Sequence, residues 1–107
     1  MTPKKKSHYN LSELKELINS KHTREITRSA RRTAAAFGYA DDEDIAMKLL
    51  ELKQKHFYVS KTAHYDSSLW HDYYKLPQES FTLFIKLQLG NDGRCYVTSF
   101  KKDEEND

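Results

Sequence analysis

The sequence predicts an α+β domain in which N-terminal helices pack against a C-terminal antiparallel β-sheet. Apolar residues recur at helical spacing in the first half of the chain and alternate with polar residues in much of the second half. The turn sequence GNDG at 90–93 separates two alternating segments, which is typical of a hairpin. At 107 residues the chain has the length of one domain. Helices followed by strands favour an α+β arrangement over alternating βαβ units.

Three helices are expected in the first half of the chain. Asn10 and Glu13 form a variant of the capping box, and the leucine spacing that follows predicts a helix over about 11–19. After a short connection or brief strand at 21–26, Thr27 can cap a second, alanine-rich helix that ends near Gly38. Four consecutive acidic residues at 41–44 suit the positive N-terminus of a third helix, predicted over 41–55. The acidic run lacks the alternating ligands and central glycine of a calcium loop.

Three strands are expected in the second half. Residues 56–62 (HFYVSKT) predict a short strand, residues 80–89 alternate strictly, and residues 94–102 return after the turn to complete an antiparallel hairpin. Residues 64–77 (HYDSSLWHDYYKLP) show neither helical nor strand periodicity. We expect this segment to form a loop that Trp70 anchors in the core and that ends at Pro77.

Charge is distributed unevenly along the chain. Residues 1–40 carry nine lysines and arginines against three acidic residues, residues 41–102 carry nine of each, and residues 103–107 carry four acidic residues. We therefore expect a single domain over 1–107 with a mobile basic arm at 1–9 and an acidic tail at 103–107. The basic N-terminal third favours contact with phosphates, and the alternative is a solvated helix face. Arg28, Arg31 and Arg32 oppose the dipole of the second helix, which favours a binding role for them.

Several functional classes lack their sequence signatures. No apolar run is long enough to span a membrane, and no apolar segment follows the basic N-terminus as in a secretory signal. The single cysteine, Cys95, cannot form an internal disulfide and suits a cytoplasmic location. The five histidines include no HExxH pair, so the remaining metal alternative is His64 and His71 flanking Asp66. No cofactor is expected.

Ordinary polar side chains can cleave RNA, because the substrate carries its own nucleophile, the 2′-hydroxyl. The reaction needs a group that accepts the hydroxyl proton, a cation that stabilises the phosphorane and an acid for the leaving 5′-oxygen. The second half of the chain is rich in suitable side chains: Tyr58, Lys61, His64, His71, Tyr74, Lys75 and Lys101. Neighbouring antiparallel strands can bring them together. The alternative for each tyrosine is a half-buried packing role.

The chain resembles the MqsR toxins of bacterial toxin–antitoxin systems, which are mRNA-cleaving members of the RelE-like ribonuclease group. The resemblance begins at HYNLSELKELINS (8–20), continues through TRSA (27–30) and FYVSKTAHYDSSLWHDYYK (57–75), and ends at SFKK (99–102). The order and spacing of these motifs over nearly the whole chain make the resemblance specific.

The resemblance implies a RelE-like fold and a metal-independent, sequence-selective endoribonuclease that cleaves mRNA and arrests growth. It also implies neutralisation by a cognate antitoxin, which we expect to be a zinc-binding helix-turn-helix protein, and no membrane partner. Functional positions proposed for the family fall on His8, Arg28, Tyr58, His71, Lys75 and Lys101.

The chain departs from the family pattern at three positions. Val59 stands where the pattern has a lysine, His71 where it has a glutamine, and Phe84 where it has a tyrosine. Lys61 shares a predicted strand face with Val59 and is a candidate replacement for the missing lysine. His71, unlike an amide, can titrate near neutral pH.

These considerations yield two sets of candidate residues. The catalytic candidates are His71, Tyr58, Lys61, Lys75 and Lys101. The RNA-binding candidates are His8, Arg28, Arg31, Arg32 and Tyr74. In this assignment His71 is the general base or acid, Tyr58 supports it, and the lysines neutralise the phosphate. The alternative function is a non-catalytic RNA- or protein-binding module on the same fold.

Overall fold

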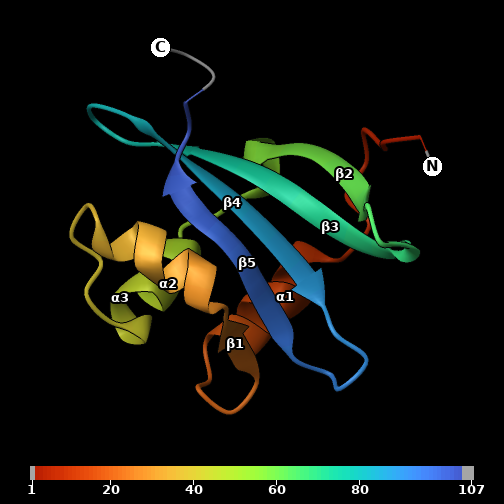
Figure 1. Ribbon diagram of the computed structural model, residues 1–107, viewed down its shortest axis with the longest axis horizontal. Helices are drawn as coiled ribbons and strands as arrows, with labels where there is room; N and C mark the ends of the chain where they lie inside the picture. The colour runs from red at the N-terminus through yellow and green to blue at the C-terminus, as the bar shows by residue number, and fades with distance from the viewer. Residues whose placement is uncertain (1, 105–107) are drawn as a thin grey trace.

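The computed structural model describes residues 2–104, and this part of the chain forms three α-helices packed against a five-stranded sheet (Figure 1). The helices are α1 (Leu11–Ile18), α2 (Arg28–Ala35) and α3 (Asp42–Leu49), and a 3-10 turn, η1 (Gln54–His56), follows them. The strands are β1 (Arg24–Ile26), β2 (Phe57–Ala63), β3 (Asp66–Pro77), β4 (Thr82–Leu89) and β5 (Cys95–Lys102). The predicted α+β class, with helices before most of the sheet, is confirmed.

The strand order in the sheet is β1-β5-β4-β3-β2. The four C-terminal strands are antiparallel to one another, in line with the predicted antiparallel sheet, although only three of them were expected. The short strand β1 pairs in parallel with β5, with Arg24 opposite Cys95, so the sheet is mixed. Local periodicity could not show this, because a three-residue strand carries no information about which distant strand it will join.

Each helix begins at a side chain that accepts a hydrogen bond from a backbone N–H three residues later. These side chains are Asn10, Thr27 and Asp41, with bonds of 3.1, 3.2 and 2.9 Å. The predicted helix starts are therefore correct. Helix α3 ends earlier than predicted, because the chain turns after Leu49 and the Leu52 carbonyl accepts a hydrogen bond from Lys15 of α1 at 2.8 Å.

The hydrophobic core lies between the helices and one face of the sheet. Leu14 of α1 and Leu49 of α3 are fully buried there, together with alternate residues of the strands such as Ile85, Val97 and Phe100. Small side chains let α2 approach β5 closely, and both Ala30 and Ala34 are fully buried. No helix of the described residues is long and apolar enough to cross a membrane.

Residues 66–77, predicted to be part of a loop, instead form β3, a twelve-residue strand between β2 and β4. The loop prediction was wrong because the two faces of β3 are not divided into apolar and polar residues. Asp72 and Tyr74 are buried on the core side, whereas the aromatic Tyr73 faces the other way. Side-chain alternation is present, but simple hydropathy does not reveal it.

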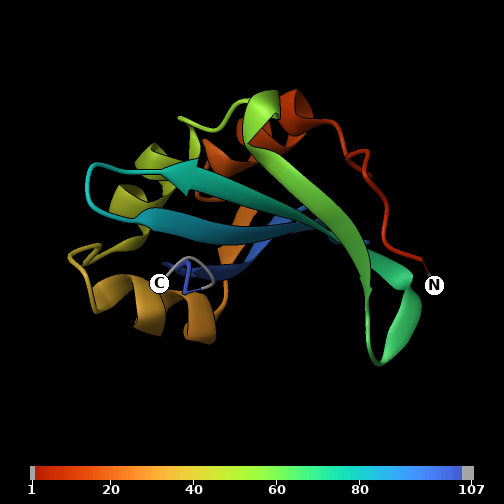
Figure 2. The same ribbon diagram turned by 90° about the horizontal axis from the view of Figure 1, so that it is seen from above.

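Residues 4–9, expected to form a mobile arm, lie beside β2 (Figure 2). Lys4 and Ser60 exchange two backbone hydrogen bonds of 2.7 and 2.8 Å, which extends the sheet at its edge. The Asp72 carboxylate accepts hydrogen bonds from the backbone N–H groups of His8 and Tyr9 at 3.0 and 2.9 Å. The arm is therefore bound to the sheet by a buried charge and by strand pairing.

Trp70 is buried, as expected, with 8% of its surface exposed, but the arm covers it. The ring of His8 stacks on the indole with 5.0 Å between centroids, and the Lys4 ammonium lies 4.0 Å from the indole centroid. The Tyr9 hydroxyl donates a hydrogen bond of 2.9 Å to the Trp70 carbonyl. Trp70 thus anchors the arm at the end of the sheet.

The start of the predicted acidic tail is also attached to the sheet. Asp103 is buried, its N–H donates to the Thr82 carbonyl at 2.8 Å, and its carboxylate pairs with Lys75 at 3.4 Å. Residues 105–107 of that tail lie outside the described residues.

The hydrogen bonds that Asp72 accepts from the arm lead to a stability prediction. Replacing Asp72 with Asn removes the buried charge and leaves one backbone N–H facing an amide NH2, so the free energy of unfolding should fall by about 1–3 kcal/mol. Urea denaturation measures the loss, and the emission of the single tryptophan, Trp70, should shift to the red as the arm detaches. The control Asp44→Asn, exposed on α3, should stay within about 0.5 kcal/mol of the wild type. Equal stability of the two variants would contradict this role for Asp72.

Candidate active site

The face of the sheet opposite the core carries most of the candidate catalytic residues. Strand register places Lys61 of β2 directly opposite His71 of β3. One step along the strands, Val59 of β2 lies opposite Tyr73 of β3. Tyr73 lies opposite Lys86 of β4, and Lys86 lies opposite Ser99 of β5. The predicted common face of Val59 and Lys61 is therefore present, and it brings Lys61 to His71.

A pocket of about 400 Å³ opens on this face, where β2 and β3 meet β4 and β5. The volume is within the range of small-ligand sites. Its polar and aromatic lining includes Lys61, His64, Tyr65, His71, Tyr73 and Lys86, with Thr98 and Ser99 at the β5 side. We call this the sheet-face pocket.

Two lysines in the sheet-face pocket lie over one aromatic ring. The ammonium groups of Lys61 and Lys86 are 5.3 and 4.9 Å from the centroid of Tyr73. Neither lysine belongs to any ion pair found within residues 2–104. The positive charge of the pocket is thus available to an anionic ligand.

The environment of His71 favours its neutral form. Burial lowers the pKa of His71, and the nearby positive charge of Lys86 lowers it further, while Asp72 acts in the opposite direction. Burial, followed by the charge of Lys61, also lowers the pKa of Lys86. Burial of His71 and the charge of Lys86 both favour the uncharged imidazole, which is the form that can accept a proton.

A second group of candidates lies farther along the same face. A bulge between Phe57 and Val59 turns Tyr58 toward Lys75, whose ammonium is 4.1 Å from the Tyr58 centroid. Strand pairing then places Lys75 opposite Phe84, and Phe84 opposite Lys101. The structure therefore separates Tyr58, Lys75 and Lys101 from the pocket that holds His71 and Lys61.

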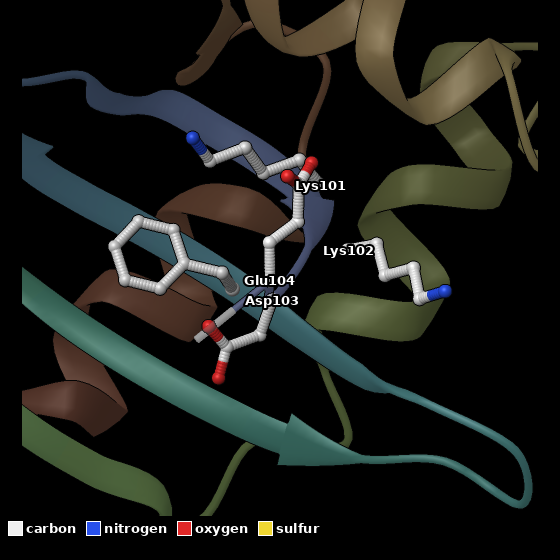
Figure 3. A pocket seen from close by; sticks show the side chains of 5 residues that line it. Lys101, Lys102, Asp103 and Glu104 are labelled. Carbon is white, nitrogen blue, oxygen red and sulfur yellow. The ribbon is translucent and has the colours of Figure 1, made fainter. Parts of the chain in front are cut away.

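The Lys101 end of this row borders a hollow of about 300 Å³ (Figure 3). Lys101 lies 5.5 Å from the centroid of Phe84. Figure 3 shows Lys102 projecting to the other side of β5, away from Lys101. Of the two terminal lysines of β5, Lys101 thus shares the open face with the candidate site.

The RNA-binding candidates lie outside the sheet-face pocket. Tyr74 is fully buried in the core, where burial raises the pKa of its hydroxyl, so we remove it from the candidate site because RNA cannot reach it. His8 packs on Trp70 of the arm. The arginines are exposed on α2, and Arg31 forms two hydrogen bonds, of 2.8 and 2.7 Å, with Asp42.

Sequence reasoning missed two members of the pocket, Tyr73 and Lys86. Tyr73 follows His71 by two residues, and Lys86 follows Phe84 by two, so strand alternation places each beside a residue already under consideration. The signal was hidden because β3 was expected to be a loop.

The described residues contain no group of three or more His, Cys, Asp or Glu side chains positioned to share a metal ion. His64 and His71 both line the sheet-face pocket, whereas Asp66 is absent from its lining. The metal alternative based on these two histidines thus has no third ligand of these types in residues 2–104.

Comparison with known proteins decides the family. Residues 6–102 match the family described as "Motility quorum-sensing regulator, toxin of MqsA". The chain belongs to the MqsR toxin family. It is also 29% identical over 99 residues to the mRNA interferase toxin MqsR of Escherichia coli (strain K12), an alignment that covers 92% of this chain and 97% of that protein. The MqsR family match runs from the arm to the end of β5, and it confirms the resemblance inferred from the motifs.

The charges around His71 in this MqsR-family chain generate a titration prediction. By NMR, the His71 ring should titrate below the ordinary value of about 6.5. Lys86→Met removes one of the charges that disfavour protonation, so the pKa of His71 should rise toward that value while the effect of burial remains. The control Lys101→Met, which removes the charge beside Phe84, should leave the pKa of His71 unchanged. Equal pKa values of His71 in wild type and Lys86→Met would contradict the coupling.

Proposed function

We propose that this MqsR-family chain is an mRNA interferase toxin: a metal-independent, sequence-selective endoribonuclease of the cytoplasm. One observation carries the proposal. A half-buried histidine held in its neutral form shares a pocket with two lysines that no carboxylate in the described residues neutralises. That combination suits a phosphodiester whose own 2′-hydroxyl must lose a proton. The name of the Escherichia coli relative supports the same activity.

In the proposed reaction His71 accepts the proton of the 2′-hydroxyl as general base. The 2′-oxygen attacks the adjacent phosphorus, and Lys61 and Lys86 stabilise the negative charge of the phosphorane. The products are a 2′,3′-cyclic phosphate and a 5′-hydroxyl. A carboxylate in this pocket would repel the substrate, and none of the residues that line it is acidic.

The second group of candidates, Tyr58, Lys75 and Lys101, extends the proposed RNA-binding surface beyond the reacting phosphate. Lys101 neutralises a phosphate next to the scissile one, Lys75, which pairs with Asp103, adds positive charge beside it, and Tyr58, a residue that is 47% exposed, offers its ring as a stacking surface for a base. His8, Arg28, Arg31 and Arg32 then contribute positive charge or contacts away from the pocket. Recognition of a short sequence depends on the bases that the open face accepts.

The proposed partner that controls this activity is a cognate antitoxin, a zinc-binding helix-turn-helix protein encoded beside the toxin. The family description, a toxin of MqsA, supports such a pair. Co-expression with the adjacent reading frame should relieve growth arrest. Persistent arrest at equal antitoxin levels would contradict neutralisation.

A non-catalytic binding module is the second candidate function. Val59 favours it, because an apolar side chain on β2 stands directly opposite Tyr73, at the position where the family pattern has a lysine. Induced expression separates the two functions: a toxin arrests growth, whereas a binding module leaves growth unchanged.

Cleavage itself is tested by primer extension on mRNA incubated with the purified protein and EDTA. We expect discrete cuts with EDTA present, and His71→Ala should lower the rate by roughly 10²–10⁴-fold because the general base is lost. The matched control is His22→Ala, an exposed histidine in the turn before β1, which should cleave at the wild-type rate. No cut by the wild type would overturn the enzyme assignment, and equal cutting by His71→Ala would overturn the role of His71.

The lysine opposite His71 is tested separately. Lys61→Ala should slow single-turnover cleavage by roughly a hundredfold, the usual consequence of losing one transition-state stabiliser. Lys21→Ala removes an exposed charge from a distant turn and controls for the change in net charge. A rate for Lys61→Ala equal to that of the control would show that Lys61 takes no part in the chemistry.

A further inference from the structure

The proposed reaction still lacks a donor for the proton that the leaving group gains. The departing 5′-oxygen must gain a proton, and His71 in its neutral form is the acceptor of the step, not the donor. We propose that the hydroxyl of Tyr73 is the general acid that protonates the leaving 5′-oxygen. This assignment rests on the proposed ribonuclease function and adds a catalytic residue to it.

The position of Tyr73 on β3 suits an acid that works with His71. The two residues are separated by one, so both project from the open face, and both line the sheet-face pocket. Two residues of a strand span roughly 6.6 Å, which leaves room for a phosphate between an imidazole and a phenol. Base and acid can then act on the attacking and leaving oxygens from opposite sides of the phosphorus.

The ring of Tyr73 is held by its neighbours. It packs edge-to-face against Phe84, with 5.6 Å between centroids and 80° between planes. Its strand neighbours are Val59 on one side and Lys86 on the other. An acid confined in this way needs little reorganisation when the reaction occurs.

The two lysines over the ring suit the charge that proton donation creates. When Tyr73 gives up its proton it becomes a phenolate, and the ammonium groups of Lys61 and Lys86, 5.3 and 4.9 Å from its centroid, stabilise that anion. The same lysines stabilise the phosphorane before the bond breaks. Phosphate and phenol therefore use one pair of cations at successive stages.

Other tyrosines are less suited to this role. Tyr65 also lines the pocket, but it is 81% exposed at the turn between β2 and β3. Tyr58 lies over Lys75, outside the pocket. Tyr9 and Tyr96 already donate their hydroxyl protons, to the Trp70 carbonyl and to Asp92.

The proposed step is balanced in bonds and protons. The O2′–P bond forms as the P–O5′ bond breaks, the 2′-hydroxyl proton moves to His71, and the phenol proton moves to O5′. The products are the 2′,3′-cyclic phosphate, the 5′-hydroxyl, a protonated His71 and a Tyr73 phenolate. Proton transfer through water from the imidazolium to the phenolate restores both residues for the next turnover.

The test uses Tyr73→Phe, which keeps the ring and removes only the hydroxyl. The cleaved bond is first mapped, and two oligonucleotides containing it are made, one natural and one with sulfur in place of the bridging 5′-oxygen. On the natural substrate, single-turnover cleavage by Tyr73→Phe should fall by about 10²–10⁴-fold. A thiolate leaves without protonation, so on the sulfur substrate the variant should cleave within a few-fold of the wild type.

The matched control is Tyr96→Phe, another tyrosine of the open face, which should resemble the wild type on both substrates. Circular dichroism checks that Tyr73→Phe is folded. Equal losses on the two substrates would overturn the assignment, because they would show a binding or packing role for the hydroxyl. An unchanged rate on the natural substrate would also overturn it. If the wild type cleaves neither substrate, the proposed function itself fails, and the two failures are thereby distinguished.

Discussion

The alternation of side chains along β3 is the constraint on which both the core and the candidate site depend. Tyr74 and Leu76 enter the core from one face, while His71 and Tyr73 project from the other. A shift of one residue in the pairing would exchange the two sets, placing His71 in the core and Tyr74 in solvent. The carboxylate of Asp72, bound by the backbone of the arm, makes such a shift costly, because moving it to the other face would break both hydrogen bonds and leave the N–H groups of His8 and Tyr9 without their acceptor.

On the open face, Lys61, Lys86 and Lys101 pair with aromatic rings, whereas Lys75 contacts both a ring and the Asp103 carboxylate. An exposed contact between an ammonium and a ring is worth about 0.5–1 kcal/mol, too little to prevent the ammonium from turning toward a phosphate. Hydrogen bonds between charged groups contribute more, about 1.5–3 kcal/mol. The rings therefore hold Lys61, Lys86 and Lys101 in place without neutralising them. Besides burial, the charge of Lys86 disfavours protonation of His71, so attraction of a phosphate and the neutral state of His71 have a common origin.

The sequence predicts those elements whose signals are local. Helix starts follow from Asn10, Thr27 and Asp41, whose side chains bond to N–H groups only three residues away. The hairpin of β4 and β5 follows from its turn. By contrast, β3 escaped prediction because its buried members, Asp72 among them, are stabilised by contacts with a segment more than sixty residues away. When β3 is taken for a loop, the neighbours of His71 on the sheet cannot be inferred. Neither Tyr73 nor Lys86 is then recognised as part of the candidate site. The family motifs still pointed to His71, since a motif needs no knowledge of strand pairing, and side-chain alternation along the predicted strand at 56–62 pointed to Lys61.

The order of strands also determines when the molecule can first act. The last strand, β5, lies between β4 and β1, and it receives its parallel partner from residues near the start of the chain (Figure 1). A polypeptide still being synthesised therefore cannot close its sheet until residues 95–102 have emerged from the ribosome. Ser99 at the edge of the pocket and Lys101 both belong to β5. The helices and earlier strands alone therefore cannot assemble the candidate site, because part of its lining belongs to a strand that joins both ends of the sheet's sequence order.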